Sequence, residues 1–204
     1  MLYELTTLAL LPNRLGAVMP LLSEVCAAAA PSGKLLGCFS VEFGALNRFH
    51  LLSRYENTDA IGADRARRME QVDPYGIAEH LGGVSRTAYK PLSFSKEIVP
   101  GAFGPFYEFR TYTLAPDGLA ETEDAWAKVI ERRDAMSPLL GIMASIEGAP
   151  KKMLHIWPYK ALEDRVKARA QASKEGIWPP PGGSAQLTSL TSELAVSTAS
   201  SPPK

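Results

Sequence analysis

The second half of the chain opens with a segment that alternates in the manner of a β-strand. Residues 107–114 (YEFRTYTL) are rich in aromatic side chains and threonine. After the break at 115–118 (APDG), residues 119–134 carry Leu119, Trp126 and Val129 near helical spacing. The pattern therefore predicts a strand followed by a helix.

The next three segments continue this order. Residues 139–147 (LLGIMASIE) and 151–159 (KKMLHIWPY) predict two strands, joined by a turn at Gly148-Ala149-Pro150. Residues 161–174 predict a second helix because apolar side chains recur along one face. A weaker last strand, near 190–197, completes a βαββαβ order.

The first half of the chain repeats this pattern. When the chain is aligned with itself at a shift of 104 residues, identical residues fall together without gaps at strand starts, turn glycines and helices. Among the matches are Tyr3-Glu4 with Tyr107-Glu108, Gly44-Ala45 with Gly148-Ala149, Tyr55 with Tyr159, and Arg65 with Arg169. Backbone geometry restricts the residue at many such positions. We interpret the match as a tandem duplication.

The repeat predicts an α+β fold class. Two ferredoxin-like βαββαβ repeats, residues 1–100 and 105–200, each form an antiparallel sheet with both helices on one face. The uncovered face of each sheet needs a partner. We therefore expect the two sheets to pack face to face as a single-chain α+β barrel.

Composition excludes several classes of protein. Twenty-two basic residues balance 22 acidic ones, which argues against a nucleic-acid partner. No apolar run is long enough for a membrane span. Cys26 and Cys38 lack the spacing of a zinc site or disulfide scaffold, so we expect buried free thiols. No nucleotide-binding or hydrolase motif is present, and we expect neither a metal nor a cofactor.

Several segments together resemble the NIPSNAP family. Residues 107–114 are similar to its YELRTYTL opening, and 153–159 (MLHIWPY) to its strand with histidine and tryptophan. Residues 162–165 (LEDR) resemble its following helix, and 44–48 (GALNR) its G-P-L-N-R hairpin. The resemblance covers both halves and implies the dimeric α+β barrel fold.

The first half departs from the family pattern. At the shift of 104 residues, Leu51 stands at the position of His155, Ser53 at that of Trp157 and Thr6 at that of Arg110. We therefore expect any functional site to be asymmetric and to belong mainly to the second half.

The candidate site follows from strand alternation. Polar and aromatic residues share one face on each of the strands 107–114 and 151–159, which are neighbours in the predicted sheet. We expect these faces to point into the space between the two sheets, with the apolar faces toward the helices. The candidate ligand-binding residues are Glu108, Arg110, Tyr112, His155, Trp157 and Tyr159. As catalytic candidates, His155 is suited to proton transfer and Arg110 to binding an oxyanion, with Tyr112 beside them.

Each candidate also has a structural interpretation. Arg110 with Glu108 is typical of an internal ion pair, and His155 of a hydrogen-bonded core histidine. Trp157 and Tyr159 fit packing anchors. Arg165 and Arg169 are expected on a solvated, salt-bridged helix face.

Three functions stay open at this point. The first is a NIPSNAP-like protein of unassigned activity that binds a small apolar or acidic metabolite between the sheets. The second is a cofactor-independent monooxygenase-like or isomerase-like enzyme, by fold analogy. The third is a non-catalytic interaction or scaffold protein. Because the chain starts at its first strand, we expect a bacterial, cytoplasmic protein. Since the tandem halves already satisfy the pairing that the barrel needs, we expect a monomer or a homodimer.

Overall fold

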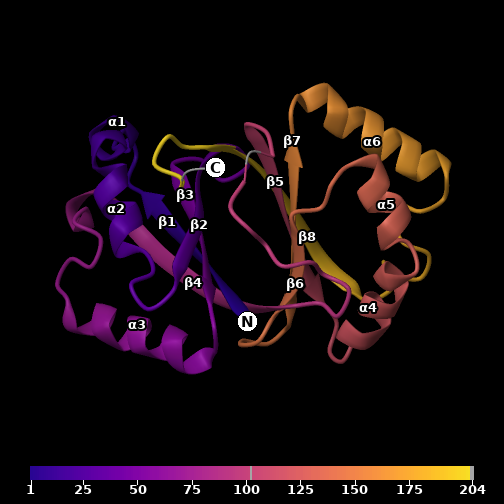
Figure 1. Ribbon diagram of the computed structural model, residues 1–204, viewed down its shortest axis with the longest axis horizontal. Coiled ribbons are helices and arrows are strands. Elements are labelled where there is room, and N and C mark those ends of the chain that lie inside the picture. The colour runs from indigo at the N-terminus through magenta and orange to yellow at the C-terminus, as the bar shows by residue number, and fades with distance from the viewer. Residues whose placement is uncertain (102, 203–204) are drawn as a thin grey trace. The chain divides into compact units, whose positions relative to one another are not determined.

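The chain divides into two compact units, each built from strands and helices of one half (Figure 1). The structure is a computed structural model that describes residues 1–101 and 103–202. The first unit takes in Met1–Lys90, Val99–Gly101 and the end of the chain from Ala195. The second takes in Pro91–Ile98 and the chain from Phe103 to Leu194. The units thus differ from the predicted segments 1–100 and 105–200 at their ends, because residues 91–98 and the C-terminal segment each pack with the other half's elements.

The first unit contains the sheet order β4-β1-β3-β2, with antiparallel neighbours. Its strands are β1 (Leu2–Leu10), β2 (Lys34–Phe43), β3 (Arg48–Tyr55) and β4 (Leu81–Pro91). Its α-helices are α1 (Leu15–Val18), α2 (Leu22–Ala28) and α3 (Thr58–Glu70), and short 3-10 turns cover Met19–Leu21 and Ala78–His80. Asn57 caps α3 by accepting a hydrogen bond from the Ala60 N–H.

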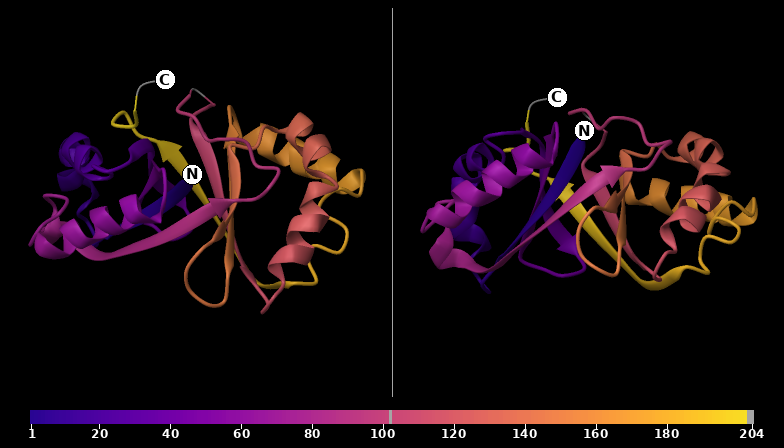
Figure 2. Two further views of the ribbon diagram at one scale, coloured as in Figure 1. Left: turned by 60° about the horizontal axis from the view of Figure 1, so that its bottom comes forward. Right: turned by 90° about the horizontal axis from the view of Figure 1, so that it is seen from below.

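The second unit has the matching order β8-β5-β7-β6. Its strands are β5 (Phe106–Leu114), β6 (Gly141–Ser145), β7 (Lys152–Tyr159) and β8 (Leu187–Ser197), the last three residues of which belong to the first unit. Its helices are α4 (Leu119–Ala127), α5 (Ile130–Met136) and α6 (Leu162–Lys174). Within each unit the helices lie on one side of the strands (Figure 2).

The duplication is visible in the strand register. Leu2 of β1 lies opposite Tyr55 of β3, and Phe106 of β5 lies opposite Tyr159 of β7, so both partners differ by the same 104 positions. The bounds of α3 and α6 differ by the same number. Positions 104 apart are therefore structural counterparts.

The expected fold class, two tandem ferredoxin-like α+β repeats, is confirmed. One expected helix is wrong: residues 119–134 form two helices, since α4 ends at Ala127 and α5 begins at Ile130. The strand expected at 139–147 is shorter, Gly141–Ser145. The face-to-face packing of the two sheets stays a prediction.

Both cysteines are free and buried, as expected. The backbone of Cys38 also anchors the end of the chain within the first unit. Its carbonyl accepts hydrogen bonds from the Thr198 N–H (2.9 Å) and from Ser201 Oγ (2.7 Å). Within the described ranges, no helix combines the length and the apolar character that crossing a membrane requires.

Candidate functional site

The six predicted site residues come together on two neighbouring strands. In the register of β5 with β7, Glu108 pairs with Trp157 and Arg110 pairs with His155. All six side chains are buried, and they share one face of the sheet. The predicted cluster therefore exists in the second unit.

The face that carries this cluster is the opposite of the one expected. Arg165 and Arg169 of α6 form ion pairs with Glu108, and Trp126 of α4 packs against His155. The cluster thus lies between the sheet and the helices of its own unit. The alternation of polar and apolar residues could not show which face meets the helices, because side chains on both faces of β5 and β7 are buried.

Glu108 is the centre of the polar contacts. Its carboxylate accepts hydrogen bonds from four side chains and lies 3.7 Å from a further guanidinium, that of Arg169. The four donors are Arg110 Nη1 (2.7 Å), Arg165 Nη2 (2.8 Å), Ser192 Oγ (2.7 Å) and the Tyr159 hydroxyl (3.4 Å). Burial raises the pKa of Glu108, but the hydrogen bonds of Arg165 and Ser192 and the charge of Arg110 outweigh it and lower the pKa to about 2. Glu108 is therefore a carboxylate at neutral pH.

Arg110 is engaged within the protein. Besides Glu108, it donates from Nε to the Tyr112 hydroxyl at 2.9 Å. Its guanidinium carbon lies 5.2 Å from the ring centre of Trp178. The internal ion pair that the sequence left as one interpretation of Arg110 is thus present, and the Tyr112 hydroxyl is held by it.

His155 is fully buried between two rings. Its ring centre lies 4.7 Å from that of Tyr112 and 4.6 Å from that of Trp126, both edge to face. Neither ring nitrogen has a hydrogen-bond partner within the described chain, so the expected hydrogen-bonded core histidine is wrong. Burial, followed by the charge of Arg110, lowers its pKa well below 6.5. His155 is therefore a neutral imidazole at pH 7.

A further arginine of this layer, Arg133 of α5, was not predicted from the sequence. It is 2% exposed and its guanidinium lies 4.2 Å from the ring centre of Trp157. The Tyr159 hydroxyl lies within hydrogen-bonding reach of it. Nε and Nη1 have no hydrogen-bond partner, and no carboxylate of residues 1–101 or 103–202 lies within ion-pair distance of it. Burial lowers its pKa, but an arginine stays charged in a protein.

The expected solvated face of α6 is also wrong for its arginines. The side chains of Arg165 and Arg169 are 31% exposed and point to Glu108. A signal for this was present in the sequence, since Glu4 and Arg65 recur as Glu108 and Arg169 in both repeats. An acidic residue on the strand and a basic residue on the helix, both present in each repeat, indicate an ion pair between strand and helix.

A groove opens beside this layer, between α5, α6 and the end of β7. Its cavity volume is about 550 Å³. Tyr159, Ala168 and Ser137 line it, and Ser137 Oγ is buried with no hydrogen-bond partner among the described residues. The other lining residues are Phe103, Met136, Pro138, Pro158, Lys160, Asp164, Lys167 and Gln171. Of the predicted site residues, only Tyr159 reaches this groove.

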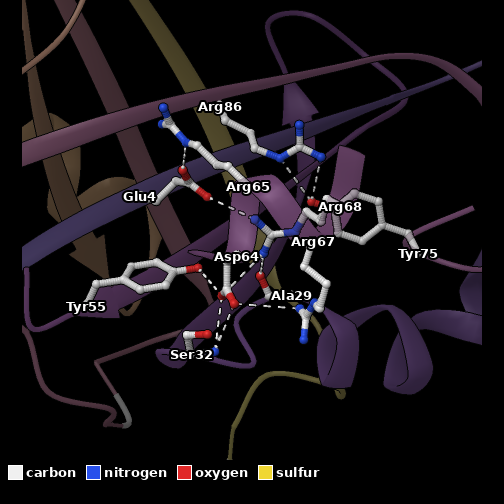
Figure 3. A network of polar contacts seen from close by, with 10 residues as sticks. All are labelled: Glu4, Ala29, Ser32, Tyr55, Asp64, Arg65, Arg67, Arg68, Tyr75 and Arg86. Carbon is white, nitrogen blue, oxygen red and sulfur yellow. Dashed lines mark hydrogen bonds and ion pairs between the residues drawn. The ribbon is translucent and has the colours of Figure 1, made fainter. Parts of the chain in front are cut away.

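The first unit contains a related polar network (Figure 3). Glu4 accepts a hydrogen bond from Arg65 Nε at 2.7 Å, as its counterpart Glu108 does from α6. Arg68 lies 3.6 Å from Glu4 and 3.9 Å from Asp64, and donates to the carbonyl oxygen of Ala29. The buried cation of this repeat therefore has two carboxylates beside it.

Comparison with known proteins agrees with the duplicated architecture. A family model described as NIPSNAP matches the chain twice, over residues 3–96 and 107–202. The Dictyostelium discoideum protein named Protein NipSnap homolog is 25% identical over 177 residues, 86% of this chain and 77% of that protein. Protein NipSnap homolog 1 of Danio rerio is 34% identical over 87 residues, 43% of this chain and 31% of that protein. The chain thus spans less than a third of that relative's length.

A solved structure described as an anthrone oxidase-like protein aligns with 96% of this chain and 90% of its own, with a TM-score of 0.68. Its sequence identity is 11%, so this likeness shows the fold alone. Since the family model covers both repeats, the chain belongs to the NIPSNAP family and carries two tandem copies of its domain.

Proposed function

We propose that the chain binds a small organic molecule with an apolar body and an acidic group in the groove of the second unit. The supporting observation is the groove itself, about 550 Å³ in volume. This volume lies in the range of about 300–1,000 Å³ typical of small-molecule sites. The proposal moves the ligand expected between the sheets to the layer between sheet and helices.

The lining of the groove suits such a ligand. Apolar contact comes from Met136, Pro138 and Ala168. Lys160 and Lys167 carry positive charge at its rim, against one carboxylate, Asp164. That carboxylate accepts a hydrogen bond from the Ala161 N–H at the start of α6. A mostly apolar site with a few convergent polar groups is the usual form of a ligand pocket.

Catalysis is not part of the proposal. The catalytic candidates Arg110 and Tyr112 are bonded to each other, and His155 is sealed between aromatic rings. The resemblance to an oxidase-like structure concerns the fold, and a shared fold carries many activities.

The experiment is a ligand screen with a blocked groove. Native mass spectrometry of the purified chain first detects any retained molecule, and the same spectrum gives the oligomeric state, monomer or homodimer. A thermal-shift screen of small aromatic and aliphatic acids follows, because a ligand that binds only the folded chain raises its melting temperature. Gln171→Trp fills the rim of the groove. Ala170→Trp, at an exposed position of the same helix, is the control.

We expect ligands that stabilise the wild type and Ala170→Trp to lose their effect on Gln171→Trp. Hits that stabilise Gln171→Trp equally would place the site elsewhere, and a screen without hits would contradict the proposal. We also propose that the protein is bacterial and cytoplasmic. Fractionation of the source cells tests its location.

A further inference from the structure

Ala168 in the second repeat is the counterpart of Asp64 in the first. The two residues lie 104 positions apart on α6 and α3, whose bounds differ by the same shift. Both residues are buried. Ala168 lines the groove, together with Tyr159, the counterpart of Tyr55. The groove of the second repeat thus adjoins the position that a carboxylate occupies in the first.

In the first repeat, the carboxylate of Asp64 at this position is surrounded by hydrogen-bond donors and guanidinium groups (Figure 3). Asp64 Oδ2 accepts a hydrogen bond from the Tyr55 hydroxyl at 3.0 Å. The Ser32 N–H lies 3.0 Å from Oδ1 and 3.2 Å from Oδ2. The guanidinium groups of Arg67 and Arg68 lie 3.7 and 3.9 Å away. The carboxylate is thus held by a tyrosine, a donor from the segment after α2, and arginine charge.

The second repeat keeps the tyrosine and a buried guanidinium, and it lacks the carboxylate. At the other two partner positions, Met136 stands for Ser32 and Gln171 for Arg67. Tyr159 corresponds to Tyr55. The guanidinium comes from the other helix: Arg133 is the counterpart of Ala29, and Ala172 that of Arg68. In both repeats the arginine lies within hydrogen-bonding reach of the tyrosine hydroxyl.

A third donor lies at the end of α5. Ser137 follows Met136, which is the counterpart of Ser32. Ser137 is 5% exposed, and its hydroxyl has no hydrogen-bond partner in the described part of the chain. Ser137 lines the groove. Contact with the Trp157 ring stabilises the Arg133 cation but supplies no counter-charge.

We infer that the ligand of the groove is a carboxylate, and that its carboxylate group takes in the second repeat the role of the Asp64 side chain in the first. Ser137 on the groove wall is its donor. The buried Arg133, within hydrogen-bonding reach of the Tyr159 hydroxyl, supplies positive charge, and Lys160 and Lys167 attract the ligand at the rim. This inference rests on the proposed function and names the ligand's acidic group. A planar carboxylate is favoured over a phosphate because the first repeat contains a carboxylate at the equivalent position, beside the equivalent tyrosine.

The first experiment supplies the carboxylate from the protein itself. Ala168→Asp recreates the side chain of the first repeat, and Ala168→Asn has the same shape without the charge. We expect Ala168→Asp to melt several degrees above Ala168→Asn, since the aspartate meets an unpaired arginine. A melting temperature at or below that of Ala168→Asn would overturn the inference, whether or not a ligand is known.

The second experiment uses benzoate and benzamide as probes, with phenyl phosphate for the alternative anion. We expect benzoate to bind the wild type at least tenfold more tightly than the other two, by calorimetry or NMR titration. Ala168→Asp should abolish benzoate binding, and Ala170→Asp, on the exposed side of α6, should leave it unchanged.

The outcomes separate the two proposals. Benzamide binding as tightly as benzoate, with both blocked by Gln171→Trp, would overturn the carboxylate inference and leave the groove as a ligand site. Preference for phenyl phosphate would replace the carboxylate with a phosphate. If no probe or screened molecule binds, the proposed function fails, and the melting temperatures of the two Ala168 variants still decide whether the position accepts a carboxylate.

Discussion

The guanidinium of Arg165 lies 2.8 Å from the carboxylate of Glu108 and connects α6 to the central strand β5. Glu108 is 1% exposed and is the counter-ion that Arg110 and Arg165 share. A buried carboxylate with several cationic partners is costly to neutralise, because its partners then stay buried without a counter-charge.

Glu108→Gln should therefore lower the free energy of unfolding by about 3 kcal/mol at pH 7. The pKa of Glu108 falls from 4.5 to about 2 on folding, so its contribution is complete above pH 4.5 and is lost as the pH falls toward 2. Urea unfolding of both proteins between pH 7 and 3 checks this. The difference should shrink below pH 4.5; a constant difference would mean that Glu108 is not the titrating group.

The architecture and the strands that carry the site were predictable from the sequence. Residues 107–114 and 151–159 differ from β5 and β7 by one residue each, since alternation over a strand is a strong signal. Because the two halves repeat one another, the elements predicted in one half also predicted those of the other half.

The direction of the polar face was not predictable from alternation. Leu154 and Ile156 on one face of β7 and His155 and Trp157 on the other are all buried. What decides the face is the set of partners on the helices, above all the arginines of α6. Arg133 was missed for a related reason: its counterpart is Ala29, so the repeat gives no signal for it.

His155 should make the stability of the chain depend on pH near neutrality. Its pKa is lowered by burial, so the folded chain keeps it neutral while the unfolded chain protonates it below about pH 6.5. Stability is complete above that pH and falls as the pH drops below it.

His155→Leu, which restores the residue type of its counterpart Leu51, should remove this dependence. Free energies of unfolding measured at pH 7.5 and 5.5 check it, and His80→Gln, at a half-buried histidine of the first unit, is the control. If the His155→Leu variant loses as much stability at pH 5.5 as the wild type, the burial of a neutral imidazole is not the cause.

Gly104 should tolerate no side chain. Its φ is +131°, and a Cβ there would overlap the backbone carbonyl of Tyr159. Gly104→Ala is expected to cost about 2–4 kcal/mol of unfolding free energy, from backbone strain and overpacking together. Because the neighbouring Phe103 lines the groove, ligand binding should weaken as well.

The matched control for Gly104 is Gly148. Its φ is +74°, but a Cβ there would meet nothing within 4 Å. Gly148→Ala should therefore cost only the strain, about 1 kcal/mol. Equal losses in chemical denaturation would show that the contact with Tyr159 contributes nothing.

Arg68 and Arg133, both buried, should respond differently to removal of their charge. Arg68→Met removes a guanidinium that lies 3.9 Å from the carboxylate of Asp64 and 3.6 Å from that of Glu4. We expect a loss of about 3 kcal/mol, as for other broken buried pairs. Arg133→Met removes a buried cation that has no carboxylate within ion-pair distance in the described part of the chain, and it fills a similar volume. Its loss should stay below about 1 kcal/mol, since the relief of an uncompensated charge offsets the lost contact with Trp157.

Parallel urea denaturation of both variants measures the contrast. A loss at Arg133 as large as that at Arg68 would mean that its charge is already compensated in the free protein, which would count against an acidic ligand in the groove.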